Sequence, residues 1–144
     1  MSKLSTVAQN LVNIISDIPD FGGRVGMTLG GTEADPTLSM TDTPHAWVVL
    51  NGSQALGQDR ERWEKVRWNF TVFVGLPYGK GEEDFTDKQL SLIESVCQAV
   101  AGTQVNAPGP VQWSFDGVSF NGADPHVIRY ALSFSIPTFY TQST

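Results

Sequence analysis

Residues 59–75 read DRERWEKVRWNFTVFVG, a run of mixed charges that becomes an apolar strand without a break. From residue 66 onward the side chains alternate, and alternation of period two is the pattern of a β-strand with one covered face. Polar residues on the second face favour an antiparallel sheet. The predicted covered face carries Val66, Trp68, Phe70, Val72 and Val74, and the second face carries Arg67, Asn69, Thr71 and Phe73.

Two other segments have apolar residues at steps of three and four, which predicts two amphipathic helices. The first spans about residues 4–17 and is ended by Pro19 and the Gly22-Gly23 pair. The second spans about residues 86–101, with Thr86 or Asp87 as its cap. Its expected apolar stripe is Leu90, Ile93, Val96, Cys97 and Val100.

The remaining segments predict further strands and the turns between them. We expect a short strand at residues 24–29, a loop at 30–44, and a buried strand at 46–50 that ends at Asn51-Gly52. Gly75 is expected to break the strand quoted above. Asp116-Gly117 is a two-residue hairpin signal between strands at 111–115 and 118–120. The last strand, 127–136, alternates again.

The chain of 144 residues suits one domain, residues 1–144. The order helix, three strands, helix, three strands predicts an α+β fold, a mostly antiparallel sheet with two helices packed on one face. The expected buried core includes Leu11, Ile14, Trp68, Phe70, Val72, Ile93, Val96, Leu132 and Phe134.

The composition excludes several classes of protein. A formal charge of −6 argues against general binding to the phosphate backbone of nucleic acids. The single Cys97 excludes an intrachain disulfide and fits a reducing cytosol. We expect no secretory signal and no membrane span, since no apolar run approaches about 20 residues.

Gly75-Leu76-Pro77-Tyr78-Gly79-Lys80-Gly81 resembles a phosphate-binding loop because it follows a strand and precedes a helix. Only three residues separate Gly75 from Gly79, and Gly81 replaces the magnesium-binding hydroxyl. Pro77 removes an amide donor. A surface loop without a nucleotide is the better interpretation.

Catalytic and metal motifs are equally weak. His45 and His126 are the only histidines, and neither has a base or nucleophile at a diagnostic spacing. No ligand pair has the spacing typical of a metal site. Cys97 lies on the predicted apolar stripe, where a free cysteine behaves as a small core residue. We therefore expect no enzyme activity, no metal and no cofactor.

The charged half of the opening stretch has three possible roles: a nucleic-acid contact, a solvated loop, or a protein interface. Arg60, Arg62, Lys65 and Arg67 accompany Trp63, but Asp59, Glu61 and Glu64 interleave them. The resulting mixed charge is more typical of a protein contact than of a DNA-reading surface. The alternative is a polar loop over residues 52–64.

If the strand continues back to about Arg60, it is about 50 Å long, at ~3.3 Å per residue. One small core cannot cover that length, so the charged half would project as an arm with Trp63 near its tip. An exposed Trp among charges of both signs is typical of an interface anchor. Glu82, Glu83 and Asp84 are the expected partners of Arg60 and Arg62 on a neighbouring subunit. The complete predicted interface is Arg60, Arg62, Trp63, Glu64, Lys65, Arg67, Glu82, Glu83 and Asp84.

This order of elements resembles that of tail terminator proteins of long-tailed phages. The runs WNFTVFV (68–74) and VIRYALSFSI (127–136) look like the central and last strands of that family. The resemblance covers nearly the whole chain and is one of order, length and pattern, so no functional residue is transferred from it.

The resemblance implies a non-enzymatic virion protein, made in the host cytoplasm, that forms a hexameric ring. The ring would stop growth of the tail tube and form the surface that joins the head. The implied partners are other copies of the chain, the tail tube protein and a head–tail connector or neck protein, with DNA passing through the lumen as cargo. The alternatives are another neck, head-completion or tube protein, or a small ligand-binding or enzyme domain that uses residues 75–81.

Overall fold

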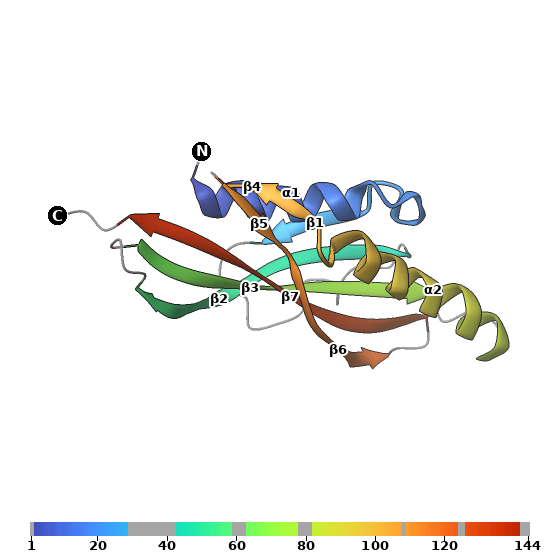
Figure 1. The fold of residues 1–144 in the computed structure, drawn as a ribbon. Helices are drawn as coiled ribbons and strands as arrows, with labels where there is room; N and C mark the ends of the chain where they lie inside the picture. The colour runs from blue at the N-terminus through green and yellow to red at the C-terminus, as the bar shows by residue number, and fades with distance from the viewer. Residues whose placement is uncertain are drawn as a thin grey trace.

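The computed structural model describes residues 2–28, 43–58, 63–77, 82–107, 109–123 and 126–141. Within these ranges the side chains of Gln58, Trp63, residues 82–86, Lys88 and Thr141 are not described. The elements along the chain (Figure 1) are α1 (Lys3–Ser16), a 3₁₀ turn (Pro19–Phe21), β1 (Val25–Thr28), β2 (His45–Gln58), β3 (Trp63–Pro77), α2 (Glu82–Val100), β4 (Gln104–Asn106), β5 (Pro110–Gln112), β6 (Ser114–Ala123) and β7 (Val127–Thr141).

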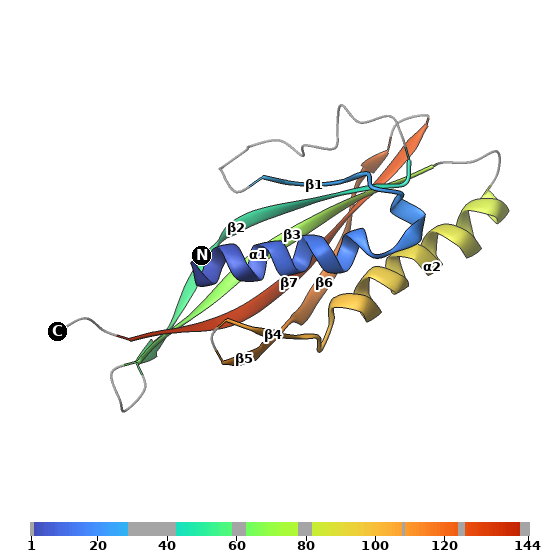
Figure 2. The same cartoon turned by 90° about the horizontal axis from the view of Figure 1, so that it is seen from above.

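Five of the strands form one sheet in the order β1-β2-β3-β7-β6. β1 runs parallel to β2, and every other neighbouring pair in this sheet is antiparallel. β4 and β5 form a separate antiparallel pair. Both helices lie on the same side of the large sheet (Figures 1 and 2). The predicted α+β class is confirmed.

The core lies between this helical layer and one face of the sheet. α1 begins with a cap, the Ser2 hydroxyl accepting from the Ser5 amide at 3.0 Å. The sheet contributes alternate residues of β3 and β7, as their period-two pattern predicts. The core side chains from the four elements are Val7, Ala8, Leu11 and Ile15 on α1, Leu92, Ile93, Val96 and Val100 on α2, Phe70, Val72, Val74 and Leu76 on β3, and Leu132, Phe134 and Ile136 on β7.

Trp113 joins α1 to the sheet from the short connection between β5 and β6. Its ring packs edge-on against Phe70, with 5.4 Å between the centroids. Its indole Nε1 donates to Asn10 Oδ1 at 2.8 Å, so the one polar atom of a nearly buried ring has a partner. No pattern in the sequence pointed to this contact, because the two residues are far apart along the chain.

The predicted end of β2 at Asn51-Gly52 is wrong. The strand continues to Gln58, and Gly52 sits in a β-bulge where the register against β3 shifts after Leu50. Asn51 is the extra residue of this bulge, and Gly52, with a φ of 157°, resumes the register opposite Asn69. The pairing with β3 thus overrides a local turn signal.

The predicted hairpin at Asp116-Gly117 is also wrong. Residues 114–123 form one continuous strand, β6, and its register against β7 shifts between Phe115 and Gly117. Gly117 has a φ of 144°, so it supplies the backbone of a second bulge rather than a chain reversal. β4 and β5 precede β6 as two short strands, so four strands follow α2 in the described residues where three were predicted.

Smaller differences concern element ends and the edges of the core. β3 runs through Gly75 to Pro77, and the predicted loops at 30–42 and 78–81 lie outside the described residues. Leu90, expected in the apolar stripe, is 41% exposed because the buried face of α2 is turned toward Leu92. Ile14 and Trp68 are half-buried rather than buried. The indole Nε1 of Trp68 donates a hydrogen bond to Thr138 Oγ1 at 2.8 Å.

Candidate subunit interface

Three strands extend beyond the α1 N-terminus at one end of the molecule (Figures 1 and 2). We call this projection the arm and define it as residues 51–58 of β2, 63–69 of β3 and 136–141 of β7. β3 lies in the middle and pairs with both neighbours, since Glu64 lies opposite Gln58 and Tyr140. The arm is thus a three-stranded sheet, where the sequence pattern alone predicted a single strand.

The predicted interface residues of the arm are only partly described. Arg60 and Arg62 lie outside the described residues, and Trp63 is the first residue of β3, opposite Thr141. Glu64 is exposed on the side of the sheet that carries the helices. Lys65 and Arg67 are half-buried on the opposite side.

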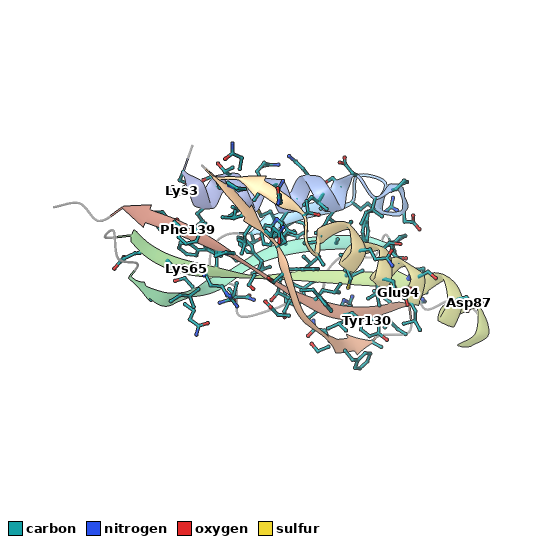
Figure 3. All side chains as sticks on the ribbon, viewed as in Figure 1. Lys3, Lys65, Asp87, Glu94, Tyr130 and Phe139 are labelled. Atoms are coloured by element: carbon teal, nitrogen blue, oxygen red, sulfur yellow. The ribbon has the colours of Figure 1, made fainter. Side chains whose placement is uncertain are left out.

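α1 holds the end of β7 by an interaction that sequence reasoning missed. The Lys3 ammonium donates to the Phe139 carbonyl and lies over the Tyr140 ring, 5.0 Å from its centroid. On the other side of the sheet the Lys65 ammonium lies 5.7 Å from the centroid of the Phe139 ring. Figure 3 labels Lys3, Lys65 and Phe139 together at this end of the molecule. The aromatic pair lies beyond Ile136, where the predicted strand ended, so this interaction could not be anticipated.

The acidic part of the predicted interface lies at the other end of the molecule. Glu82, Glu83 and Asp84 form the first turn of α2, which is the end of the helix farthest from the arm (Figure 1). Asp87, on the next turn, is exposed, and Figure 3 places it at the end opposite Lys65. Lys65 and the start of α2 therefore lie at opposite ends of one chain.

A second exposed feature is the strand β6, at the edge of the sheet. Phe115, Val118 and Phe120 are 39%, 49% and 62% exposed. They lie opposite Phe134, Leu132 and Tyr130 of β7, on the side of the sheet that carries the helices. The Phe120 ring packs against Tyr130 at 5.9 Å between centroids. Sequence reasoning missed this apolar row because it placed a hairpin in the middle of it.

A hollow and both histidines lie among the described residues. A hollow of about 250 Å³ on the arm is lined by Ala55, Gly57, Glu64, Lys65 and Val66. Among the described residues, no group of three His, Cys, Asp or Glu could hold a metal ion. His45 is buried against Gly75, whereas His126 is exposed. No helix in the described ranges is long and apolar enough to span a membrane.

Cys97 is half-buried on α2 and packs against the core. Burial raises the pKa of its thiol, and the Glu94 carboxylate adds to the rise while a backbone hydrogen bond opposes it. Since the thiolate is the reactive form, we expect iodoacetamide to alkylate Cys97 more slowly in the folded protein than in urea at pH 8. Mass spectrometry of a time course measures both rates. Equal rates would show that the thiol is open to solvent.

No family model matches this chain, and no curated protein sequence matches it. Its fold does match 34 chains of solved structures. One of them is a chain from the structure of the "virion of native gene transfer agent (GTA) particle", with a TM-score of 0.57 over 92% of each chain. The two sequences are 13% identical, so the match establishes a shared fold.

Proposed function

We propose that this protein is a structural virion protein that caps the end of a phage tail tube as a ring of identical subunits. The observation that carries the proposal is the fold match to a chain of a virion particle, which covers 92% of both chains. The structural alignment thus spans most of both chains and is not confined to one motif. The order of elements, which resembles that of tail terminators, supports the finer role.

The two ends of the molecule support assembly into a ring. A closed ring is built from heterologous contacts, in which one patch meets a different patch on the next copy. The arm carries Lys65 and Arg67 at one end, while the acidic first turns of α2 lie at the other. Opposite charges at opposite ends are suited to head-to-tail contact, although exposed pairs each contribute only about 0–1 kcal/mol. The charges would therefore select orientation and raise the association rate more than the affinity.

In this role the protein has partners and no substrate. The ring, which we propose to be a hexamer, would stop growth of the tail tube with one rim and meet a neck or connector protein with the other. DNA would pass through its lumen as cargo, and the protein would be made in the host cytoplasm. The second candidate within the same class is another neck, head-completion or tube protein, because the fold match is to a virion particle as a whole.

The proposal is tested by assembly of two arm variants, Trp63→Ala and the double variant Arg60→Glu, Arg62→Glu. We expect both to keep the melting temperature of the parent. Trp63→Ala should weaken assembly roughly 30-fold, which corresponds to about 2 kcal/mol for a hot-spot residue. Light scattering coupled to size exclusion measures the oligomer, and electron microscopy of tails grown with each variant measures tube length.

A matched control adds negative charge away from the arm, at the exposed Gln9 and Asn13 of α1 (Gln9→Glu, Asn13→Glu). This control should assemble like the parent. If the arm variants also assemble and complete tails like the parent, the charged stretch is a solvated loop and its role in the ring is excluded. A parent protein that stays monomeric and does not change tail length would overturn the proposed function.

A further inference from the structure

β6 is an edge strand that has two bulges against β7 but few of the side chains that usually protect an edge from pairing. In the described chain it pairs only with β7, so its outer backbone groups face away from the sheet. Natural edges are commonly blocked by lysines, prolines or charges, yet Ser114–Ala123 contains one charged residue, Asp116, and no proline. Its bulges leave the central residues 118–120 in regular register with β7.

A second open edge lies at the opposite end of the strand order, where β2 extends past β1. β1 pairs only with residues 46–49 of β2, so the outer edge of residues 51–58 has no partner among the described residues. This part of β2 contains no Asp, Glu, Lys or Arg. Its residues are mostly exposed, and they include Leu56, which is 38% exposed.

We infer that the β6 edge of one copy pairs with the outer edge of β2, residues 51–58, in the arm of the next copy. This inference rests on the proposed ring and names the surfaces that form it. The two edges are similar in length, about 25–35 Å at ~3.3 Å per residue, and both are almost free of charge. They are the two opposite edges of one sheet, so each copy can pair with one neighbour through β6 and with another through β2, and the same contact repeats from copy to copy.

Exposed apolar side chains lie beside both edges. Leu56 comes from the arm, and Val118 and Phe120 come from β6, so pairing of the edges would bring exposed apolar groups out of water. A ring closed in this way leaves neither edge open.

Chemical cross-linking between engineered cysteines tests which surfaces meet. In a Cys97→Ser background, Ser53→Cys marks the β2 edge and Ser119→Cys marks β6, and both positions are exposed. A short bis-maleimide should convert the variant with both cysteines into a ladder of covalent oligomers. Each single-cysteine variant should remain monomeric on a denaturing gel, because a heterologous contact does not bring identical positions together. The control variant combines Ser53→Cys with Gln9→Cys on α1 and should give no ladder.

A second test blocks the β6 edge with charge. The double variant Val118→Lys, Phe120→Lys should keep its melting temperature, since both side chains are largely exposed, and should lose assembly by roughly 30-fold or more. Gln9→Lys on the exposed face of α1 is the matched control and should assemble like the parent. Assembly of the β6 variant at the parental level would overturn the inference.

The outcomes separate this inference from the proposed function. Rings that form without the specific ladder would exclude these two edges and leave the tail-capping role intact. A ladder in a protein that does not alter tail length would support the contact and reject the tail-capping role. A protein that neither assembles nor cross-links would contradict both.

Discussion

Replacing Phe134 by Ala is expected to lower the free energy of unfolding by about 3–5 kcal/mol. Phe134 is fully buried at the centre of β7, between Phe70 of β3 and Phe115 of β6. Truncation would remove the transfer energy of the ring and leave a cavity between the sheet and the helical layer, and neighbours tied into a regular ladder cannot move far to fill it. Urea denaturation followed by circular dichroism measures the change.

Phe120→Ala is the matched control for this prediction. It makes the same chemical change on β6, at a side chain that is 62% exposed. A surface substitution of this kind usually changes stability by about 0.5 kcal/mol or less. If the two variants lost equal stability, the assignment of the covered face of the sheet would be wrong.

Replacing Gly75 by Ala is expected to cost about 1–3 kcal/mol, although alanine is otherwise acceptable in a strand. Gly75 lies opposite His45 on β2 and Arg129 on β7. An added Cβ would overlap the His45 ring. This ring is fully buried, so it cannot move aside without disturbing the residues packed around it. The expected loss of unfolding free energy comes from overpacking, and urea or thermal denaturation measures it.

A double-mutant cycle with His45→Gly isolates the cause. In that background the space above Gly75 is open, so Gly75→Ala should become neutral or stabilising, because Gly in a strand carries an entropic cost. Additive effects of the two substitutions would show that the strain lies in the backbone of β3 and not in the imidazole.

The long strands and both helices could be predicted from the sequence for a physical reason. Each has one face in water and one in the core, so burial imposes a period of two or 3.6 on the residues themselves. The alternation in β3 and β7 correctly assigned Phe70 and Phe134 to the core. The same pattern predicts a strand that runs back into the charged stretch, and β3 does begin at Trp63.

The two predicted turns were wrong because a turn signal depends on neighbouring residues in the sequence, whereas a strand is held by pairing with a segment distant in the sequence. Asn51-Gly52 and Asp116-Gly117 allow a chain reversal, but the same glycine conformations also allow a bulge within a continuous strand. Which of the two forms depends on whether a neighbouring strand pairs on both sides of the glycine. β3 does so for β2, and β7 does so for β6.

The sequence by itself determined the fold class, the two strands at the centre of the sheet and the location of mixed charge along the chain. Only the tertiary structure decided where those charges lie relative to one another, with the arm and the start of α2 at opposite ends of the molecule. It also decided which edges remain open, since β1 pairs with only a small part of β2 and no described strand pairs with the outer edge of β6. Edges and ends depend on which strands pair, and pairing between segments distant in sequence leaves no periodic mark on either of them.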